Sequence, residues 1–189
     1  MFKRLFLVVG LVASCAGLSL AREAFISLKK VDHGVREVHG GFYVEVPRPI
    51  AWQVLTDYNF IQTFVSSIQS NCVTEHHGGS VVIEQVFLAS YLFFHRRLHV
   101  LLKIQEKPPD TILFEDTSGQ DFIVYSGSWR LEKFPGSTRV VYHLRARLRS
   151  AAPGWVAQNV LSKSVQQLLY QVRAEMVRRK KTSFASASL

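Results

Sequence analysis

Few polar side chains in the chain are placed for acid–base or nucleophilic chemistry. Tyr125 and Tyr142 lie on expected strands among apolar residues, where a phenol hydroxyl can donate a proton or orient a ligand. The acidic residues nearest to the expected cavity are Asp57, Glu84, Asp116 and Asp121. None is paired with a base, and the chain has no Gly-x-Ser-x-Gly elbow, Cys-x-x-Cys pair or His-Glu-x-x-His helix. The sequence therefore assigns no catalytic residue, and it favours a buried, inert thiol for Cys72 over a nucleophile.

Two histidines on one strand raise the question of a metal site. His95 and His99 alternate with Arg97 on one face of segment 93–106. The opposite face is apolar and consists of Leu98, Val100, Leu102 and Ile104. A metal site needs three or four ligands, and outward-facing histidines on a solvated face do not supply them. We therefore expect no metal ion and no cofactor.

The N-terminal segment has the pattern of a secretory signal peptide. Residues 1–21, MFKRLFLVVGLVASCAGLSLA, carry two basic residues, then an apolar run, then small residues. The apolar run is shorter than the about 20 residues that span a membrane, so an uncleaved N-terminal anchor is the less favoured interpretation. Cleavage after Ala21 is the favoured exit, and a lipoprotein signal over 1–14 with a lipid on Cys15 is the alternative. Either route predicts export across the inner membrane to the periplasm.

The charge balance points to anionic partners. The chain has a formal net charge of +9, and removal of Lys3 and Arg4 leaves 21 basic against 14 acidic residues, or +7. Phospholipid headgroups and acidic ligands suit such a balance. Nucleic acid is the weaker choice for an exported protein, and we expect none.

Seven segments have the apolar alternation of strands. They cover residues 36–47, 67–77, 80–89, 93–106, 111–118, 121–134 and 138–150. Glycine or proline turns such as Gly78-Gly79 and Pro135-Gly136 join the last six. Because these connections are short, consecutive strands are expected to pair antiparallel as a meander.

Two short helices interrupt the strand pattern after the first strand. The stretch VPRPIAWQVLTDYNFIQTFV (46–65) contains Pro47 and Pro49, and proline is favourable in the first helical turn but not inside a strand. We expect one helix to start near Pro49 and a second to cover FIQTFV, with Asp57 or Asn59 as its N-cap.

A long amphipathic helix follows Pro153. Its apolar positions recur every three or four residues, at Ala157, Leu161, Val165, Leu168, Val172 and Met176. These elements predict a single α+β domain over 22–181 and a flexible tail over 182–189. One curved, seven-stranded antiparallel sheet wraps the long helix, and the two short helices close one end of the space between them.

Strand phase selects the side chains that face this space. The candidates are Phe87, Phe94, Phe114, Tyr125, Trp129, Tyr142, Leu144, Leu161 and Val165. Gly127 lies in phase with Tyr125 and Trp129, and its missing side chain leaves room. A mainly apolar pocket with a few hydroxyls suits a lipid or quinone. The alternative is that these residues fill a solid core.

A basic surface is expected on the opposite face of the last strand. Arg145, Arg147 and Arg149 alternate with the apolar positions there. Such a face can dock on an anionic membrane, where each cation contributes about 1 kcal/mol. The alternative is an ordinary solvated face.

The order of elements resembles the START-like, helix-grip (SRPBCC) superfamily. The strings FFHRRLHVLLKIQEKPPDTILFED (93–116) and GQDFIVYSGSWRLEKFPGSTRVVYHLRARL (119–148) look most like its polyketide cyclase/dehydrase and coenzyme Q-binding START-domain group. Together with 46–65 and the helix after Pro153, the resemblance covers residues 36–178. It implies a sheet that grips the helix around an apolar cavity for lipids, quinones or polyketides.

Three functions are compatible with these observations. The favoured one is a monomeric, non-enzymatic protein that binds or transports a hydrophobic small molecule. The first alternative, which the resemblance implies, is a cyclase or dehydrase with Tyr125 or Tyr142 as proton donor. The second is a protein-interaction module that uses the basic face, because fold does not determine function.

Overall fold

The computed structural model describes residues 24–91, 94–150 and 153–186. Along the chain the elements are β1 (Phe25–Lys30), the 3-10 turn η1 (Asp32–Gly34), β2 (Arg36–Val44), α1 (Arg48–Leu55), α2 (Ile61–Phe64), β3 (Ile68–His77), β4 (Ser80–Tyr91), β5 (Phe94–Lys107), β6 (Thr111–Asp116), β7 (Phe122–Phe134), β8 (Ser137–Leu148) and α3 (Gly154–Ser186). The expected signal segment 1–21, including Cys15, lies outside the described residues.

The strands form one antiparallel sheet in the order β1-β2-β8-β7-β6-β5-β4-β3. From β3 to β8 each strand pairs with its chain neighbour, as the short turns predict, and β2 pairs with β8. Both residues of the Gly78-Gly79 turn have positive φ, which glycine adopts without strain.

The sheet has eight strands, so the prediction of seven was one short. The additional strand, β1, pairs with β2 from Phe25↔Gly41 to Lys30↔Arg36. It is an edge strand, and only Ile26 and Leu28 turn partly inward. Two alternating apolar positions are too weak a periodic signal to predict a strand.

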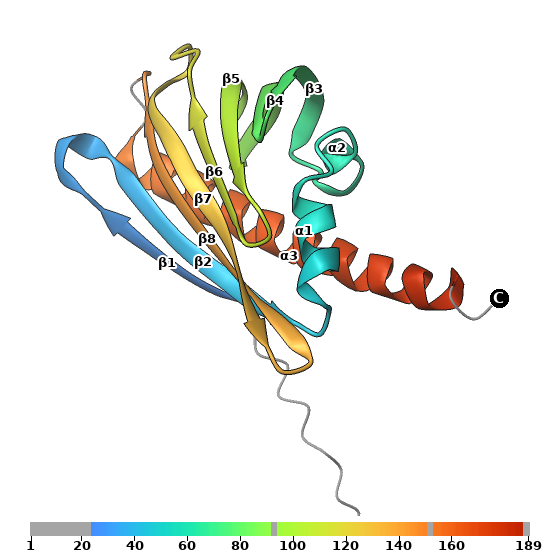
Figure 1. Cartoon of the computed structure of the whole chain (residues 1–189). Coiled ribbons are helices and arrows are strands. Elements are labelled where there is room, and N and C mark those ends of the chain that lie inside the picture. The colour runs from blue at the N-terminus through green and yellow to red at the C-terminus, as the bar shows by residue number, and fades with distance from the viewer. Residues whose placement is uncertain (1–23, 92–93, 151–152, 187–189) are drawn as a thin grey trace, which may run out of the picture.

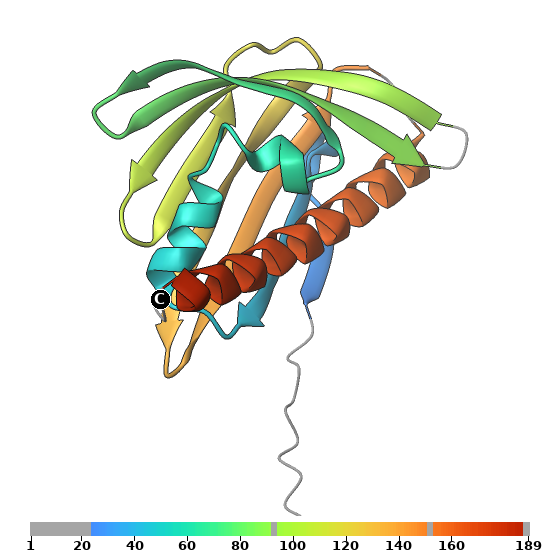
Figure 2. The same ribbon diagram turned by 90° about the vertical axis from the view of Figure 1, so that its right-hand side faces the viewer.

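Helix α3 lies across the concave face of the curled sheet (Figures 1 and 2). The second half of the helix is packed against the sheet, with Val172 and Met176 almost fully buried. Gly40 on β2 allows this approach, because a Cβ there would lie 2.7 Å from Leu169 Cδ1. The helix continues to Ser186, so the tail predicted from residue 182 starts too early. Among the described residues, no helix combines the length and apolarity that a membrane crossing requires.

The two short helices pack where the sheet and the second half of α3 meet (Figure 2). Pro49 lies in the first turn of α1, and the buried face of this helix consists of Ala51, Val54 and Leu55. The predicted capping of α2 was wrong, because its N-cap is Phe60 and no side chain caps it. Asp57 instead pairs with Arg179 of α3, a charge-assisted contact between two ionised groups.

Cys72 is exposed rather than buried as expected. It lies on β3, which is the last strand at one edge of the sheet. Its cross-strand partner is the exposed Glu84, whereas the next residue, Val73, turns toward the core. Strand phase, not residue type, therefore decides the exposure of this thiol.

Candidate functional site

A cavity of about 360 Å³ lies between the sheet and the first half of α3. Eight of the nine residues selected from strand and helix phase line it: Phe87, Phe114, Tyr125, Trp129, Tyr142, Leu144, Leu161 and Val165. The ninth, Phe94, begins β5, and its side chain lies outside the part that the structure describes. The cavity lies within the about 300–1,000 Å³ of small-molecule sites. That these side chains contact a ligand stays a prediction.

Aromatic rings from four strands form a continuous wall of the cavity. The ring of Tyr125 lies 4.6 Å from that of Phe122, 5.9 Å from Phe87 and 6.1 Å from Phe114. The wall continues through Tyr142, whose ring lies 6.1 Å from Phe114 and 4.4 Å from Trp129. Such ring spacings are favourable offset and tilted contacts. The wall is therefore aromatic and mainly apolar, and it suits a flat or flexible hydrophobic ligand.

The two tyrosine hydroxyls are the polar groups of this wall. Burial raises the pKa of both phenols, with smaller contributions from Asp116 at Tyr125 and from Tyr125 at Tyr142. Both are therefore neutral hydroxyls at physiological pH. Neither hydroxyl has a hydrogen-bond partner within the described part of the chain. Each remains available to donate to a carbonyl or hydroxyl oxygen of a ligand.

Gly127 leaves room on this wall, but a protein ring occupies it. A Cβ at this position would lie 2.6 Å from Phe114 Cζ and 2.1 Å from the backbone oxygen of His143. Phe114 is the cross-strand partner of Gly127, so its ring lies over the bare glycine. The room expected for a ligand at this point therefore holds Phe114.

Three arginines line the cavity near the N-terminal end of α3, and the sequence analysis did not place them there. Arg96 pairs with Asp121 at 2.7 Å, and the Arg36 guanidinium donates to the Gly154 carbonyl at 3.0 Å. Arg147 makes no hydrogen bond or ion pair with other described residues. This end of the cavity therefore carries a guanidinium that is available to an acidic group.

The predicted outward face of Arg145, Arg147 and Arg149 is not continuous. Arg147 is nevertheless among the residues that line the cavity, together with its chain neighbours Ala146 and Leu148. Arg145 pairs with Glu37 at 3.1 Å, and Arg149 donates to the Gly119 carbonyl at 2.9 Å. Residue alternation alone therefore misplaced Arg147.

Polar side chains beneath the short helices form a second missed group. The Tyr58 hydroxyl donates to Glu106 Oε1 at 2.7 Å, and the Asn71 amide donates to the Tyr58 carbonyl at 2.6 Å. Gln85 donates to Asn71 Oδ1 at 2.6 Å. Gln85 shares the inward phase of its apolar neighbours on β4, and this phase was the available signal. These groups hydrogen-bond to one another where the cavity meets the segment of α1 and α2 (48–64), which we call the lid.

The acidic residues do not supply a general base to the cavity. Asp57 pairs with Arg179, and Asp121 pairs with Arg96. Asp116 Oδ1 accepts from the backbone amides of Leu101 and Ser118, whereas its Oδ2 is buried without a partner among the described residues, and Asp116 does not line the cavity. Glu84 is exposed. Among the described residues that line the cavity there is no Asp, Glu, His, Lys or Cys. Proton abstraction by a side chain of this wall would therefore depend on a tyrosine that is neutral at physiological pH.

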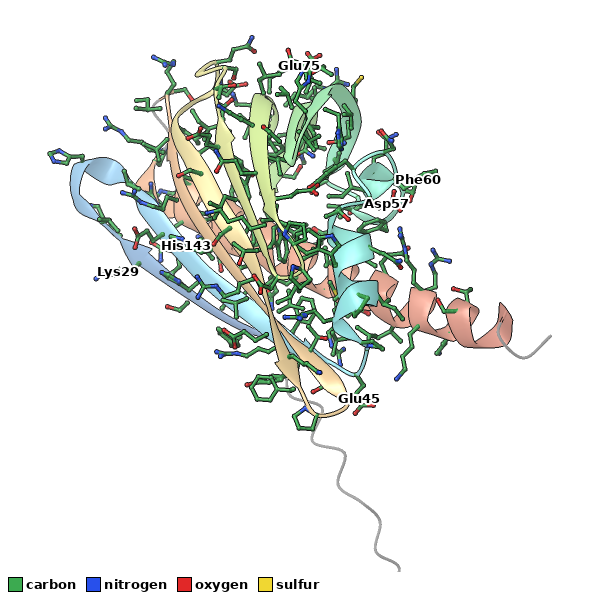
Figure 3. The ribbon with its side chains drawn as sticks, viewed as in Figure 1. Lys29, Glu45, Asp57, Phe60, Glu75 and His143 are labelled. Atoms are coloured by element: carbon green, nitrogen blue, oxygen red, sulfur yellow. The ribbon has the colours of Figure 1, made fainter. Side chains whose placement is uncertain are left out.

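An ionic cluster anchors the lid to α3. Asp57, between α1 and α2, contacts Arg179 at 2.6 Å, and Phe60 beside it projects outward (Figure 3). Glu175 Oε1 accepts from both Arg178 and Arg179 at 2.7 Å, and its side chain is only 7% exposed. The lid is therefore attached to the helix that forms the opposite wall.

Acid should weaken this anchor. The hydrogen bond from Arg178 is the main cause that lowers the pKa of Glu175 below its ordinary 4.5. A carboxyl with a lowered pKa stabilises the fold above its unfolded pKa, and this contribution is lost as the pH falls through the folded pKa. We expect Glu175→Gln to lower the free energy of unfolding at pH 7 by about 1–3 kcal/mol. The free energy of unfolding of this variant, measured by urea denaturation, should also fall less between pH 5 and pH 3 than that of the unaltered protein. The control Glu84→Gln, at an exposed position, should lose as much stability between pH 5 and pH 3 as the unaltered protein. An equal loss in all three proteins would contradict the role of Glu175 in the acid sensitivity.

Comparison with known proteins gives one family and many similar folds. The sequence profile of the family described as "Polyketide cyclase / dehydrase and lipid transport" matches residues 44–173. No curated protein matches the chain in sequence. The Zhui aromatase/cyclase from Streptomyces sp. R1128 superposes with a TM-score of 0.68 at 17% identity, over 77% of this chain and 95% of that one.

Two lipid-transfer structures are similar in the same way. The STAR-related lipid transfer protein from Xanthomonas axonopodis has a TM-score of 0.62 at 17% identity, over 80% of this chain and 98% of that one. The human StarD13 lipid transfer and protein localization domain has a TM-score of 0.62 at 15% identity, over 81% and 84%. At these identities the likenesses establish the START-like fold and no more.

Proposed function

Because the chain belongs to the polyketide cyclase/dehydrase and lipid transport family, we propose that it binds and carries a hydrophobic small molecule in the cavity beneath α3. The observation that carries the proposal is the composition of the cavity wall. It is apolar and aromatic, it encloses about 360 Å³, and its described residues include no carboxylate or imidazole. A lipid, an isoprenoid quinone or a polyketide-like molecule fits this wall.

The test is the identification of a bound molecule. The protein is purified from its own envelope, its intact mass is measured under native conditions, and the bound material is extracted with organic solvent. We expect one apolar molecule per chain. A protein of the mass of the chain alone, which also takes up no fatty-acid or quinone probe, would overturn the carrier function.

The basic end of the cavity supports a finer statement about the ligand. Arg147 lines the wall with no partner among the described side chains, whereas the rest of the wall is mainly apolar. A carboxylate or phosphate on an otherwise apolar molecule would place its charge against this guanidinium. We therefore propose an amphiphile whose acidic group lies at the N-terminal end of α3.

The Arg147→Gln variant should lose selectivity for acids. A charge-assisted hydrogen bond contributes about 1.5–3 kcal/mol, so octadecanoic acid should bind about tenfold more weakly or worse. Octadecanol has the same chain without the charge, and its affinity should not change. Both are measured by displacement of a fluorescent fatty-acyl probe. Arg97→Gln, on the exposed face of β5, is the matched control, and equal losses for acid and alcohol would refute the assignment.

A cyclase or dehydrase is the second candidate. The two tyrosine hydroxyls that are available on the wall favour it, because either can protonate a carbonyl oxygen. The lack of a base among the described lining residues counts against it. Turnover of an aromatic polyketide substrate that falls in Tyr142→Phe or Tyr125→Phe would support an enzyme. Undetectable turnover, or turnover unchanged in both variants, would leave the carrier.

Export to the periplasm is part of the proposal. It rests on the signal-like segment 1–21, and the mass of the purified protein tests it. A chain that begins at Arg22 indicates cleavage, and a chain that begins at an acylated Cys15 indicates a lipid anchor. A chain that retains residues 1–21 would contradict both routes and leave an uncleaved N-terminal anchor. Docking on an anionic membrane is a separate step, and it would bring the basic end of the cavity to the lipid surface. Binding to vesicles with and without phosphatidylglycerol tests this step.

A further inference from the structure

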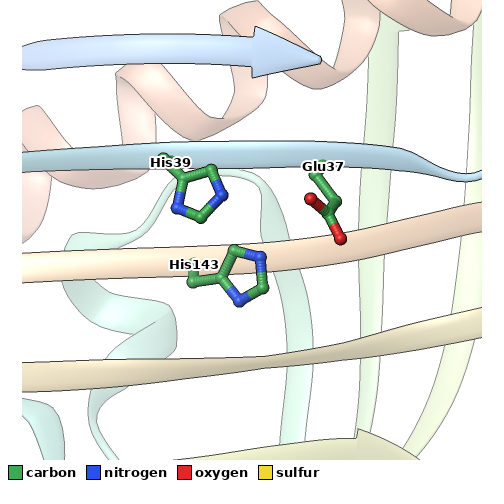
Figure 4. A group of neighbouring side chains, drawn as sticks. All are labelled: Glu37, His39 and His143. Carbon is green, nitrogen blue, oxygen red and sulfur yellow. The ribbon is translucent and has the colours of Figure 1, made fainter. Parts of the chain in front are cut away.

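Three metal-ligating side chains meet on the face of the sheet that is turned away from the cavity. Val38 on β2 is buried, so its neighbours Glu37 and His39 point outward. His143 of β8 is the cross-strand partner of His39, and the two imidazole rings stack with centroids 4.3 Å apart. One ligand atom from each of Glu37, His39 and His143 lies within 4.8 Å of the others (Figure 4).

We propose that Glu37, His39 and His143 bind a divalent transition-metal ion such as Zn²⁺. Two imidazole nitrogens and one carboxylate oxygen form a ligand set that suits Zn²⁺, Ni²⁺, Cu²⁺ and Co²⁺. The ion retains an open position for water on this solvent-facing side. The site is separate from the cavity, so it holds or fails independently of the proposed carrier function.

The distances require only small side-chain movements. Zinc bonds to nitrogen and oxygen are about 2.0–2.2 Å, so two ligand atoms on a tetrahedral ion lie roughly 3.4 Å apart. The ligand atoms now lie up to 4.8 Å apart. Side-chain rotations that move them by about 1–1.5 Å therefore bring them to bonding positions. The backbones need not move, because β2 and β8 are already hydrogen-bonded in register.

His143 has features that a metal ion would use. Its Nε2 is buried and has no hydrogen-bond partner within the described residues, which is uncommon for a polar atom in a native protein. The neutral imidazole is the form that binds a metal.

Arg145 is the competitor of the ion. Its Nε lies 3.1 Å from Glu37 Oε1, and its side chain is 46% exposed. Exposed ion pairs of this kind are weak, so a divalent ion can displace the guanidinium from the carboxylate. Replacement of Arg145 is therefore predicted to strengthen metal binding at this site. Binding to a histidine pair elsewhere on the surface would not respond to this change.

The test is metal binding by the mature chain. Zn²⁺ is titrated calorimetrically, and Co²⁺ is followed by its visible absorption, at pH 7.5. We expect one ion per chain, and binding reduced at least tenfold in His39→Ala and in Glu37→Gln. Arg145→Gln should bind roughly tenfold more tightly, because a repelling charge and a competitor are both removed. The exposed pair His95→Ala/His99→Ala is the control and should bind as the unaltered chain does.

Two results would overturn the site. One is the absence of saturable binding up to about 1 mM Zn²⁺. The other is binding that persists in His39→Ala and Glu37→Gln but disappears when the exposed His76 and His77 are replaced. The circular dichroism of each variant shows that it is folded, and a rise of the melting temperature with Zn²⁺, absent in His39→Ala, is an independent readout of the same binding.

Discussion

Replacement of Leu161 by tryptophan should prevent ligand binding and leave the fold intact. Leu161 lies on the first half of α3 and lines the cavity, so the larger indole would extend into the space that a ligand needs. If the ligand loses about 100 Å² of apolar contact, the loss is about 2.5 kcal/mol, or roughly 100-fold in affinity. Native mass spectrometry should show the protein without its ligand, and a fatty-acyl probe should bind correspondingly more weakly.

The stability of this variant separates a blocked cavity from a damaged core. Filling a void in a folded protein changes its free energy of unfolding little and can raise it. We expect a change within about 1 kcal/mol, because the larger side chain would enter the cavity that Leu161 lines. Gln166→Trp, on the exposed face of the same helix, is the matched control and should keep its ligand. A Leu161→Trp protein that is stable and still carries its ligand would place the binding site elsewhere.

The wall of the cavity was predictable because it follows two regular periods. Tyr142 and Leu144 take the inward phase of β8, and Leu161 and Val165 take the inward phase of α3. In each case the burial of an apolar side chain outweighs other local preferences. The meander of β3–β8 follows for a similar reason, since its short turns permit only antiparallel neighbours.

The polar features were not predictable, because they depend on contacts between segments far apart in the chain. Arg147 lines the cavity together with Ala146 and Leu148 on either side of it, which strict alternation along one strand does not predict. Asp57 follows the rule for a helix cap, but Arg179 lies close enough in the fold to take its carboxylate. Glu37, His39 and His143 meet only because the first long strand pairs with the last.

Replacement of Gly127 by alanine should strongly destabilise the protein. A glycine in a strand is ordinarily unfavourable, and alanine at a compatible position gains about 0.4–1 kcal/mol by restricting the unfolded chain. Here the added Cβ would lie 2.1 Å from the backbone oxygen of His143 and 2.6 Å from Phe114 Cζ. Because a backbone atom cannot rotate away, β7 and β8 must separate locally. We expect a net loss of about 3 kcal/mol in the free energy of unfolding, measured by urea denaturation.

The two contacts of the added Cβ can be separated in a double-mutant cycle. Phe114→Leu removes the ring that lies over Gly127, so the pair Phe114→Leu/Gly127→Ala should be less destabilised than the sum of the single changes by about 1 kcal/mol. The remaining loss reflects the His143 carbonyl, which no side-chain change relieves. Ser126→Ala and Ser128→Ala flank the glycine on the same strand and should cost little. A Gly127→Ala protein as stable as the unaltered chain would show that β7 and β8 are not held as closely here as the 2.1 Å approach requires.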